Sequence, residues 1–437
     1  MRYSRLLLLV FLSFIGSTVP QARAQKISSL DRGRALSMLD NVAKDIQKHY
    51  YDSNFHGTDW NAIVLKAKEQ IQSESSLNMA MADIAQAVVS LNDSHTFFIP
   101  PPRPFAHTYG FQTEIVGDRC YVLRVRPGTD AEDKGLKPGD EVASWEGFTP
   151  NRDTLWKIQY RYNLLRPTPG VRVLLRDPQG QQRQVDVKAK VVQHAKLQDL
   201  TGNNIWGLIR DAETEEALRR PRWAEAGDEV AILKLPEFLV DLSEVESIIH
   251  KARKYPALIL DLRGNPGGAV ESLKFLLGGM FEKDITVAQR VGRKEFKPEV
   301  ASSRHRGAFS GKLVVLMDSR SASAAELFAR IVQLEKRGVV VGDRSSGSVM
   351  EAKRYSYSQG DDVRVFYGAE ITEADLIMSD GKSLEHVGVT PDEEVLPTAQ
   401  DLAAGRDSVL SHAAALLGAK LTPEDAGKLF PYIWPKD

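Results

Sequence analysis

The stretch that decides the fold is residues 257–268, Ala-Leu-Ile-Leu-Asp-Leu-Arg-Gly-Asn-Pro-Gly-Gly. Its first half, Ala257 to Leu262, is a short apolar run of the kind that forms a strand buried on both faces of a parallel sheet. The glycine-rich residues that follow lead into a predicted helix from Leu273 to Phe281. A buried strand, a tight turn and a helix are typical of a βαβ unit, so this stretch predicts an α/β fold.

The same alternation continues on both sides of that stretch. Val230–Leu235, Leu313–Met317 and Val339–Val341 are apolar runs that predict strands, and Ala324–Leu334 predicts a helix. Repeated units of this kind imply a parallel sheet with right-handed crossovers and functional sites at the carboxyl ends of its strands. A further helix is predicted from Leu402 to Leu417.

The composition excludes several classes of protein. The chain has 437 residues, 57 Lys+Arg against 58 Asp+Glu, 42% hydrophobic residues and one cysteine, Cys120. A net charge of −1 gives no reason to expect nucleic acid or an anionic membrane surface as a partner. A single cysteine rules out an internal disulfide and a multi-cysteine metal site. We therefore expect two or three globular domains without a metal or an organic cofactor.

The first 24 residues have the pattern of a signal peptide. Arg2 and Arg5 precede an unbroken apolar run from Leu6 to Ile15, and Ala22-Arg23-Ala24 fits a signal peptidase site. The apolar run is short for a bilayer about 30 Å thick. We expect an exported protein, periplasmic or secreted, with no membrane insertion after the leader is removed.

Residues 26–106 predict a small helical unit. Apolar residues recur at helical spacing from Asp31 to Tyr50, Asp59 is a suitable N-cap for a second helix, and Met81 to Leu91 marks a third. The unit ends in the polar loop Asn92-Asp93-Ser94-His95, which is followed by a proline-rich run.

Residues 107–190 predict a β-rich domain. Tyr121 to Val125 alternates like a strand, and two further strands flank the turn Asp177–Gly180. The segment Ala131–Val142, together with Tyr109-Gly110-Phe111, resembles a PDZ domain, in which the loop before the first groove strand binds a peptide carboxylate. The alternative is a small β-barrel that only packs. The charged, proline-broken residues 191–230 are interpreted as a linker.

Two junctions carry residues suited to chemistry. The glycines in Asp261–Gly268 let backbone N–H groups point outward at a helix N-terminus, where an anion or an oxyanion is stabilised. A serine in Asp318–Glu326 lies at the positive end of the next helix dipole. The alternative for the glycine-rich junction is a simple tight turn, and the alternative for the serine junction is an ordinary N-cap. The spacing alone does not show which of the three serines would be the nucleophile.

Other motifs are absent from the sequence. It has no Gly-x-Ser-x-Gly elbow, no His-Glu-x-x-His and no Gly-x-Gly-x-x-Gly. The residues Gly342–Gly347 have phosphate-loop spacing, but Ser348 stands where the lysine is needed, which disfavours nucleotide binding.

Taken together, the motifs resemble the C-terminal processing (tail-specific) peptidases and their tricorn-like relatives. The matching segments occur in the family's order: Leu91–Thr96, the PDZ segment, Leu260–Gly268, Ser321–Glu326 and Gly388–Asp392. The resemblance implies a crotonase-like core, with Ser323 as the nucleophile. It also implies oxyanion donors in the backbone N–H of Ala324 and of one residue of the Gly267/Gly268 pair.

The resemblance has two branches, which differ in the general base. Many processing peptidases use a Ser–Lys dyad, but the lysine position holds Ser348 in this sequence, and a serine of ordinary pKa cannot replace that base. The tricorn-like branch uses Ser–His–Glu, and His95, its neighbour Ser94 and Glu385 match that arrangement. A histidine with a carboxylate partner can accept the serine proton near neutral pH. The alternative for His95 is a loop-capping residue.

The sequence thus predicts an exported serine endopeptidase that acts on polypeptides, with a PDZ domain that binds a substrate chain end or gates access. A homo-oligomer is compatible with this prediction. The rival hypotheses are a catalytically inactive PDZ scaffold and a crotonase-like acyl-thioester enzyme. The expected segments are a signal peptide (1–24), a helical unit (26–106), a PDZ domain (107–190), a serine peptidase core (191–404) and a C-terminal helix and tail (405–437).

Overall fold

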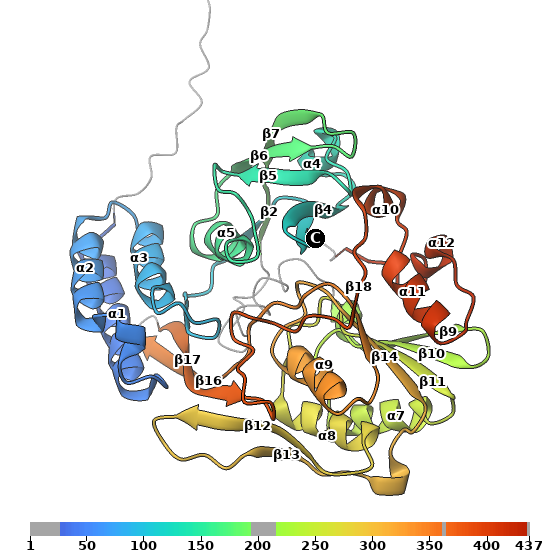
Figure 1. The fold of residues 1–437 in the computed structure, drawn as a ribbon. Coiled ribbons are helices and arrows are strands. Elements are labelled where there is room, and N and C mark those ends of the chain that lie inside the picture. Colours follow the sequence, from blue (N-terminus) through green and yellow to red (C-terminus); the bar gives the residue numbers. More distant parts are fainter. Residues whose placement is uncertain (1–26, 194–215, 361–363, 435–437) are drawn as a thin grey trace, which may run out of the picture.

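The computed structural model describes residues 27–193, 216–360 and 364–434 (Figure 1). The predicted leader and most of the predicted linker lie outside these residues. Within them, the chain forms a helical unit, a β-rich unit and a large α/β core (Figure 1). Short turns of tight helix also occur: η1 (Phe55–Gly57), η4 (Glu216–Arg219) and η5 (His305–Gly307).

The core is built on a six-stranded sheet in the order β18-β15-β14-β11-β10-β9. The predicted parallel pairing is confirmed from β10 to β15, and β18 extends it. The edge strand β9 is antiparallel to β10 and falls within the segment interpreted as a linker. The strands are β9 (Arg222–Ala226), β10 (Val230–Lys234), β11 (Ala257–Asp261), β14 (Lys312–Met317), β15 (Val339–Gly342) and β18 (Glu393–Glu394).

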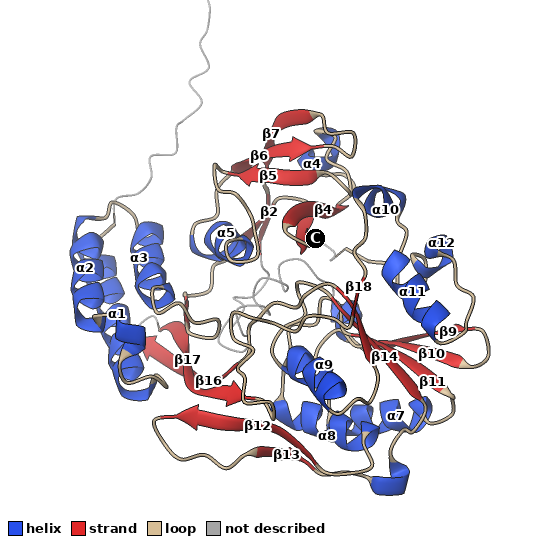
Figure 2. Cartoon of the chain, viewed as in Figure 1, coloured by secondary structure: helices blue, strands red, loops and turns tan. Residues whose placement is uncertain are grey.

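Helices cover both faces of this sheet (Figure 2). Helices α7 (Leu242–Ala252), α8 (Val270–Met280) and α9 (Ala324–Leu334) pack on one face, together with Leu258 and Leu260 of β11. Helix α11 (Ser408–Leu416) packs on the other, against Ile259. Because successive side chains of a strand point to opposite faces, both must be apolar here, which explains the unbroken apolar run in the sequence.

The N-terminal helices share a core with a second sheet. Asp59 caps the second helix as predicted, accepting a hydrogen bond from the N–H of Ala62. The shared core joins the three helices to β1 and β17. The elements are α1 (Ser29–His49), α2 (Trp60–Ser73), α3 (Leu77–Val89), β1 (Phe97–Ile99), β12 (Ile285–Gly292), β13 (Glu299–Ala301), β16 (Met350–Gln359) and β17 (Val365–Ile377).

The β-rich unit is a five-stranded antiparallel sheet in the order β3-β4-β5-β6-β7. Its strand β3 is an edge strand, and α5 lies near it. The unit contains β3 (Phe111–Val116), β4 (Arg119–Val125), α4 (Asp130–Asp133), β5 (Glu141–Trp145), α5 (Leu155–Gln159), η2 (Tyr160–Leu165), β6 (Gly170–Arg176) and β7 (Gln182–Lys188), and a ribbon of β2 (Phe105–Thr108) and β8 (Lys190–Gln193) adjoins it.

The prediction of one helix from Leu402 to Leu417 is wrong. Helix α10 (Ala399–Ala404) ends at Gly405, whose φ of 65° is left-handed and cannot continue a helix. Asp407 then caps α11 by accepting from the N–H of Leu410, and a short α12 (Pro423–Ala426) follows. A glycine stop and an aspartate start within three residues are the physical reason for the break.

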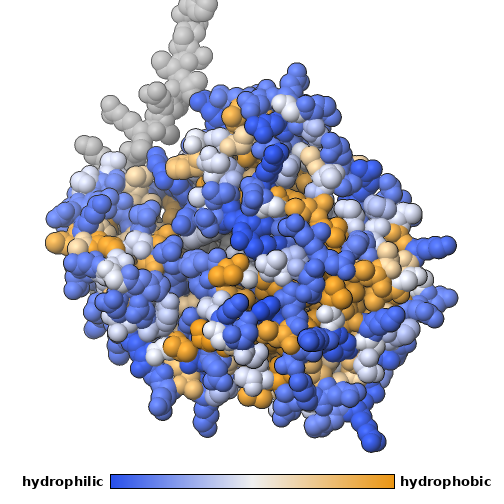
Figure 3. All heavy atoms as spheres, in the orientation of Figure 1, coloured by the Kyte–Doolittle hydropathy of each residue, from blue (hydrophilic) through white to orange (hydrophobic). Residues whose placement is uncertain are grey.

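The surface is mostly hydrophilic, with apolar residues gathered in patches around α9 and α11 (Figure 3). In the described part of the chain, no helix combines the length and hydropathy needed to cross a bilayer. The described residues also contain no cluster of three His, Cys, Asp or Glu side chains suited to a metal ion.

Candidate active site

Ser323 lies at the N-cap of α9 in a strained backbone conformation. Its φ of 55° and ψ of −119° are unusual for a residue other than glycine, and such strain is concentrated at functional sites. Its N–H donates to the carboxylate of Glu326 (3.0 Å) and to the carbonyl of Ser348 (2.9 Å). The half-buried side chain is thereby held at the positive end of the helix dipole.

The loop after β11 packs directly against Ser323. A Cβ added to Gly267 would lie 2.6 Å from the Cβ of Ser323, and one added to Gly268 would lie 2.6 Å from the backbone of Phe238. Both glycines have positive φ, so they are required by space and by conformation. Asn265 joins the two junctions: its carbonyl accepts from the N–H of Ala322, and its Oδ1 accepts from the N–H of Gly267.

Ser94, His95 and Glu385 form a hydrogen-bonded chain. The carboxylate of Glu385 accepts from the Ser94 hydroxyl (2.8 Å) and from its N–H (2.9 Å), and the same hydroxyl lies 2.8 Å from Nδ1 of His95. When Glu385 is ionised and accepts the Ser94 proton, the hydroxyl oxygen accepts from Nδ1–H. The structure therefore brings together these predicted residues, with Ser94 between the imidazole and the carboxylate.

The peptide unit between Ser348 and Val349 lies between this hydrogen-bonded chain and Ser323. The carbonyl of Ser348 accepts from the N–H of Ser323, and the N–H of Val349 donates to Glu385 (2.9 Å). In the described residues, no hydrogen bond joins the Ser323 hydroxyl to the His95 ring. The two halves of the predicted triad thus lie on opposite sides of the loop that carries Ser348, the residue at the lysine position of the dyad enzymes.

Burial shifts the pKa values of the two ionisable groups in the hydrogen-bonded chain, His95 and Glu385. His95 is 6% exposed, and burial lowers its pKa to about 4, while the charge of Asp93 acts in the opposite direction. Burial, followed by the charge of Asp93, raises the pKa of Glu385 to about 7 against the hydrogen bonds that it accepts. The resting imidazole is therefore neutral, as a general base must be.

Glu326 is a further residue of the site, with no role predicted from its motif. It is fully buried, and its carboxylate accepts from the N–H groups of Ser323, Gly347 and Ser348 and from the Ser345 hydroxyl. Burial raises its pKa to about 7, and these hydrogen bonds oppose that shift. A glutamate three residues after an N-cap serine is the capping-box signature, and this signal was present in the sequence.

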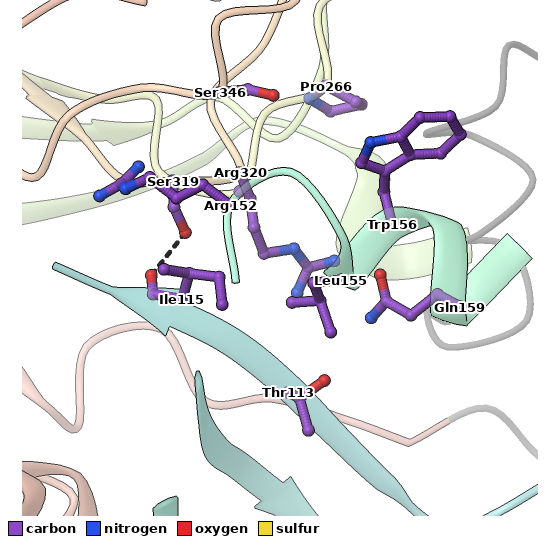
Figure 4. Close-up of a pocket in the computed structure, with 11 residues that line it drawn as sticks. Thr113, Ile115, Arg152, Leu155, Trp156, Gln159, Pro266, Ser319, Arg320 and Ser346 are labelled. Carbon is purple, nitrogen blue, oxygen red and sulfur yellow. Dashed lines mark hydrogen bonds between the residues drawn. The ribbon is translucent and has the colours of Figure 1, made fainter. Parts of the chain in front are cut away.

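A small pocket opens between the β-rich unit and the core (Figure 4). Thr113 and Ile115 of β3 line one side, and Leu155 and Trp156 of α5 line the other. Core residues close the pocket, and the Ser319 hydroxyl donates to the carbonyl of Ile115. The core residues that line it are Gly264, Pro266, Ser319, Arg320 and Ser346.

Two further contacts fix the β-rich unit to the core. Arg152 pairs with Asp343 at 2.6 Å and also donates to the carbonyl of Arg344. Glu114 lies next to Asp318, and burial followed by the charge of Asp318 raises the pKa of Glu114 to about 8. A protonated carboxyl can share a hydrogen bond with the other carboxylate, whereas two charged carboxylates repel each other.

Comparison with known proteins shows what the core is similar to. Residues 229–395 match the family model described as peptidase family S41. A tail-specific protease of Haemophilus influenzae is 25% identical over 285 residues, which cover 61% of this chain and 38% of that protein. A carboxyl-terminal-processing protease of Synechocystis is 24% identical over 370 residues, which cover 80% of this chain and 78% of that protein.

A solved structure shares the fold. The crystal structure of mature CPAF matches with a TM-score of 0.64 and 17% sequence identity, covering 86% of this chain and 95% of that one. At this identity the likeness supports the mixed α/β fold.

Proposed function

We propose that this chain is a serine peptidase that cleaves polypeptides with Ser323 as the nucleophile, because residues 229–395 match the model of peptidase family S41 and the similar proteins are proteases. The observation that carries this assignment is the hydrogen-bonded chain Glu385–Ser94–His95, which is held across one peptide unit from Ser323. Ser323 Oγ attacks the scissile carbonyl, and its proton passes to Nε2 of His95.

The direction of the hydrogen bonds supports His95 as the base. Because Nδ1–H donates to Ser94, the lone pair of the neutral ring is on Nε2, which is free to accept a proton. Glu385 acts through the Ser94 hydroxyl, so its negative charge fixes the tautomer and stabilises the imidazolium. His95 then gives the proton to the leaving amine, and water hydrolyses the acyl-enzyme by the same route.

The proposed oxyanion donors are the backbone N–H groups of Ala324 and Gly268. Ala324 is the first residue of α9, where N–H groups point outward from the helix. Of the glycine pair, Gly267 already donates its N–H to Asn265, which favours Gly268 for this role. Hydrogen bonds at catalytic sites are often long before substrate binds, so we propose that substrate draws His95 and Ser323 together.

We also propose that the core is crotonase-like and that the β-rich unit is a PDZ domain. Support for the PDZ domain comes from Tyr109-Gly110-Phe111 directly before the edge strand β3, and from the pocket between β3 and α5. An edge strand with a lined groove suits an extended peptide that pairs with the backbone. In this proposal the domain binds a substrate chain end or gates access, and residues 1–24 direct export.

The nucleophile is tested by Ser323→Ala. We expect loss of peptide hydrolysis and of labelling by a fluorophosphonate, with an unchanged melting temperature. Ser76→Ala is the matched control, because Ser76 is also an N-cap serine but lies at α3. Hydrolysis that persists in Ser323→Ala would reject the nucleophile, and a wild-type chain that neither labels nor hydrolyses would favour the inactive scaffold.

A further inference from the structure

Asp93 is a buried carboxylate on the loop that carries His95. It is 6% exposed, and its Oδ1 accepts three hydrogen bonds: from the N–H of His95 (2.7 Å), from the N–H of Thr96 (2.9 Å) and from the hydroxyl of Thr372 (2.7 Å). Thr372 belongs to β17, so these bonds attach the loop to the second sheet. They fix the backbone from which the imidazole projects.

The second oxygen of Asp93 receives none of these three hydrogen bonds. Oδ2 is buried, and the side chain of Asp93 interacts with the Tyr50 hydroxyl, whose pKa is raised by burial and then by the charge of Asp93. No lysine or arginine in the described chain forms an ion pair with Asp93. A buried carboxylate without a cation is costly, so its charge needs an explanation beyond the turn.

Hydrogen bonding alone does not require that charge. All three donors point to Oδ1, which the amide oxygen of an asparagine would replace without loss. An aspartate is therefore more than the turn needs, while an imidazole that becomes positive during the reaction lies two residues away in the chain. The negative charge favours the protonated ring, in opposition to burial.

We propose that Asp93 is a positioning residue for His95, whose buried carboxylate holds the turn and stabilises the imidazolium formed when His95 accepts the Ser323 proton. This inference rests on the proposed function. The other ionisable groups around the loop are Tyr50 and Tyr51 at the end of α1, Glu370 on β17 with its partner Arg354, and Glu385 with its neighbour His386.

The test is Asp93→Asn, which keeps the acceptor and removes the charge. In a Ser323→Ala background, NMR titration of the labelled His95 ring should give a pKa lower by about 0.5–1 unit than in the parent, since one unit is a tenfold change in proton affinity. In the active chain, kcat should fall about 10- to 100-fold with little change in KM.

Two control variants separate charge from structure. Asp93→Ala removes the acceptor as well and should lower the melting temperature, whereas Asp93→Asn should not. Asp59→Asn changes a capping aspartate at α2 and should leave the His95 titration unchanged.

An unchanged His95 pKa in Asp93→Asn would overturn the inference, whatever the activity. Equal melting losses in Asp93→Asn and Asp93→Ala would also overturn it. A shifted pKa in a chain that hydrolyses no peptide would support the coupling and reject the proposed function instead.

Discussion

The protonation state of one carboxyl group decides which nitrogen of His95 can act. An ionised Glu385 accepts the Ser94 proton, so Ser94 accepts from Nδ1–H, and the lone pair of the proposed base is left on Nε2. A protonated Glu385 would donate to Ser94, which would then donate to Nδ1 and leave the proton on Nε2. Because Ser94 lies between them, the basicity of His95 depends on Glu385, a residue that it does not touch. We call this arrangement the Ser94 relay.

Activity should consequently rise with pH through about 7. Glu385 has its pKa raised to about 7, and the ionised form is the active one, so activity is lost as the pH falls below that value. Glu385→Gln should reduce kcat by about 10⁴-fold, as when the acid of a serine protease triad loses its charge. The measurement is kcat against pH for the wild type and the variant.

The control for this prediction is Glu393→Gln, which alters a glutamate bonded to His412 away from the site. It should retain the wild-type profile. If Glu385→Gln kept most of its activity with an unaltered acid limb, the Ser94 relay would not be the path by which His95 is oriented.

At the scale of elements, one buried side chain joins α9 to the loop before β16. Glu326 is on the first turn of the helix, and three of its four hydrogen-bond donors come from residues 345–348. The fourth is the N–H of Ser323. The loop at the lysine position of the dyad enzymes is thus fixed in place here by a carboxylate.

Glu326→Gln should destabilise the chain by about 2–6 kcal/mol. Each carboxylate oxygen accepts from two donors, and an amide NH2 at either position would face two of them, leaving buried donors unsatisfied at about 1–3 kcal/mol each. Urea unfolding measures the loss. Glu271→Gln on the exposed start of α8 should change stability little, and equal stability of the two variants would contradict this role for Glu326.

The sequence predicted elements where local pattern and burial agree. Helix α9 has the predicted bounds Ala324–Leu334, and β11 is one residue shorter than predicted, because their apolar runs are buried as the pattern requires. The long hairpin of β16 and β17 escaped prediction, since it is half-exposed and is stabilised by the distant helices of residues 29–89. The contact of Ser94 with Glu385 spans 291 residues, so spacing could not show that the serine lies between histidine and carboxylate.

At the scale of the whole molecule, the β-rich unit is docked on the α/β core through its proposed peptide groove. The Ser319 hydroxyl holds the carbonyl of Ile115 on the edge strand β3, where an added peptide strand would need a backbone partner. Ser319 precedes Ser323 by four residues. We therefore expect that a peptide entering the proposed groove would disturb the loop that leads to Ser323, the proposed nucleophile.

This docking should weaken at alkaline pH because of Glu114. Its pKa is raised from the ordinary value near 4.5 to about 8 by burial and by Asp318, with Arg320 and Arg124 opposing the shift. A group with a raised folded-state pKa contributes stability that is fully present below 4.5 and is lost as the pH rises through about 8. After correction for the pH dependence of the intrinsic chemical exchange rate, amide hydrogen exchange in β3 should therefore still be faster at pH 9 than at pH 6.

Glu114→Gln, which resembles the protonated carboxyl, should remove this remaining difference in exchange rate, while Glu132→Gln on the exposed helix α4 should retain it. Equal protection of β3 at both pH values in the wild type would mean that the carboxyl pair does not control the docking.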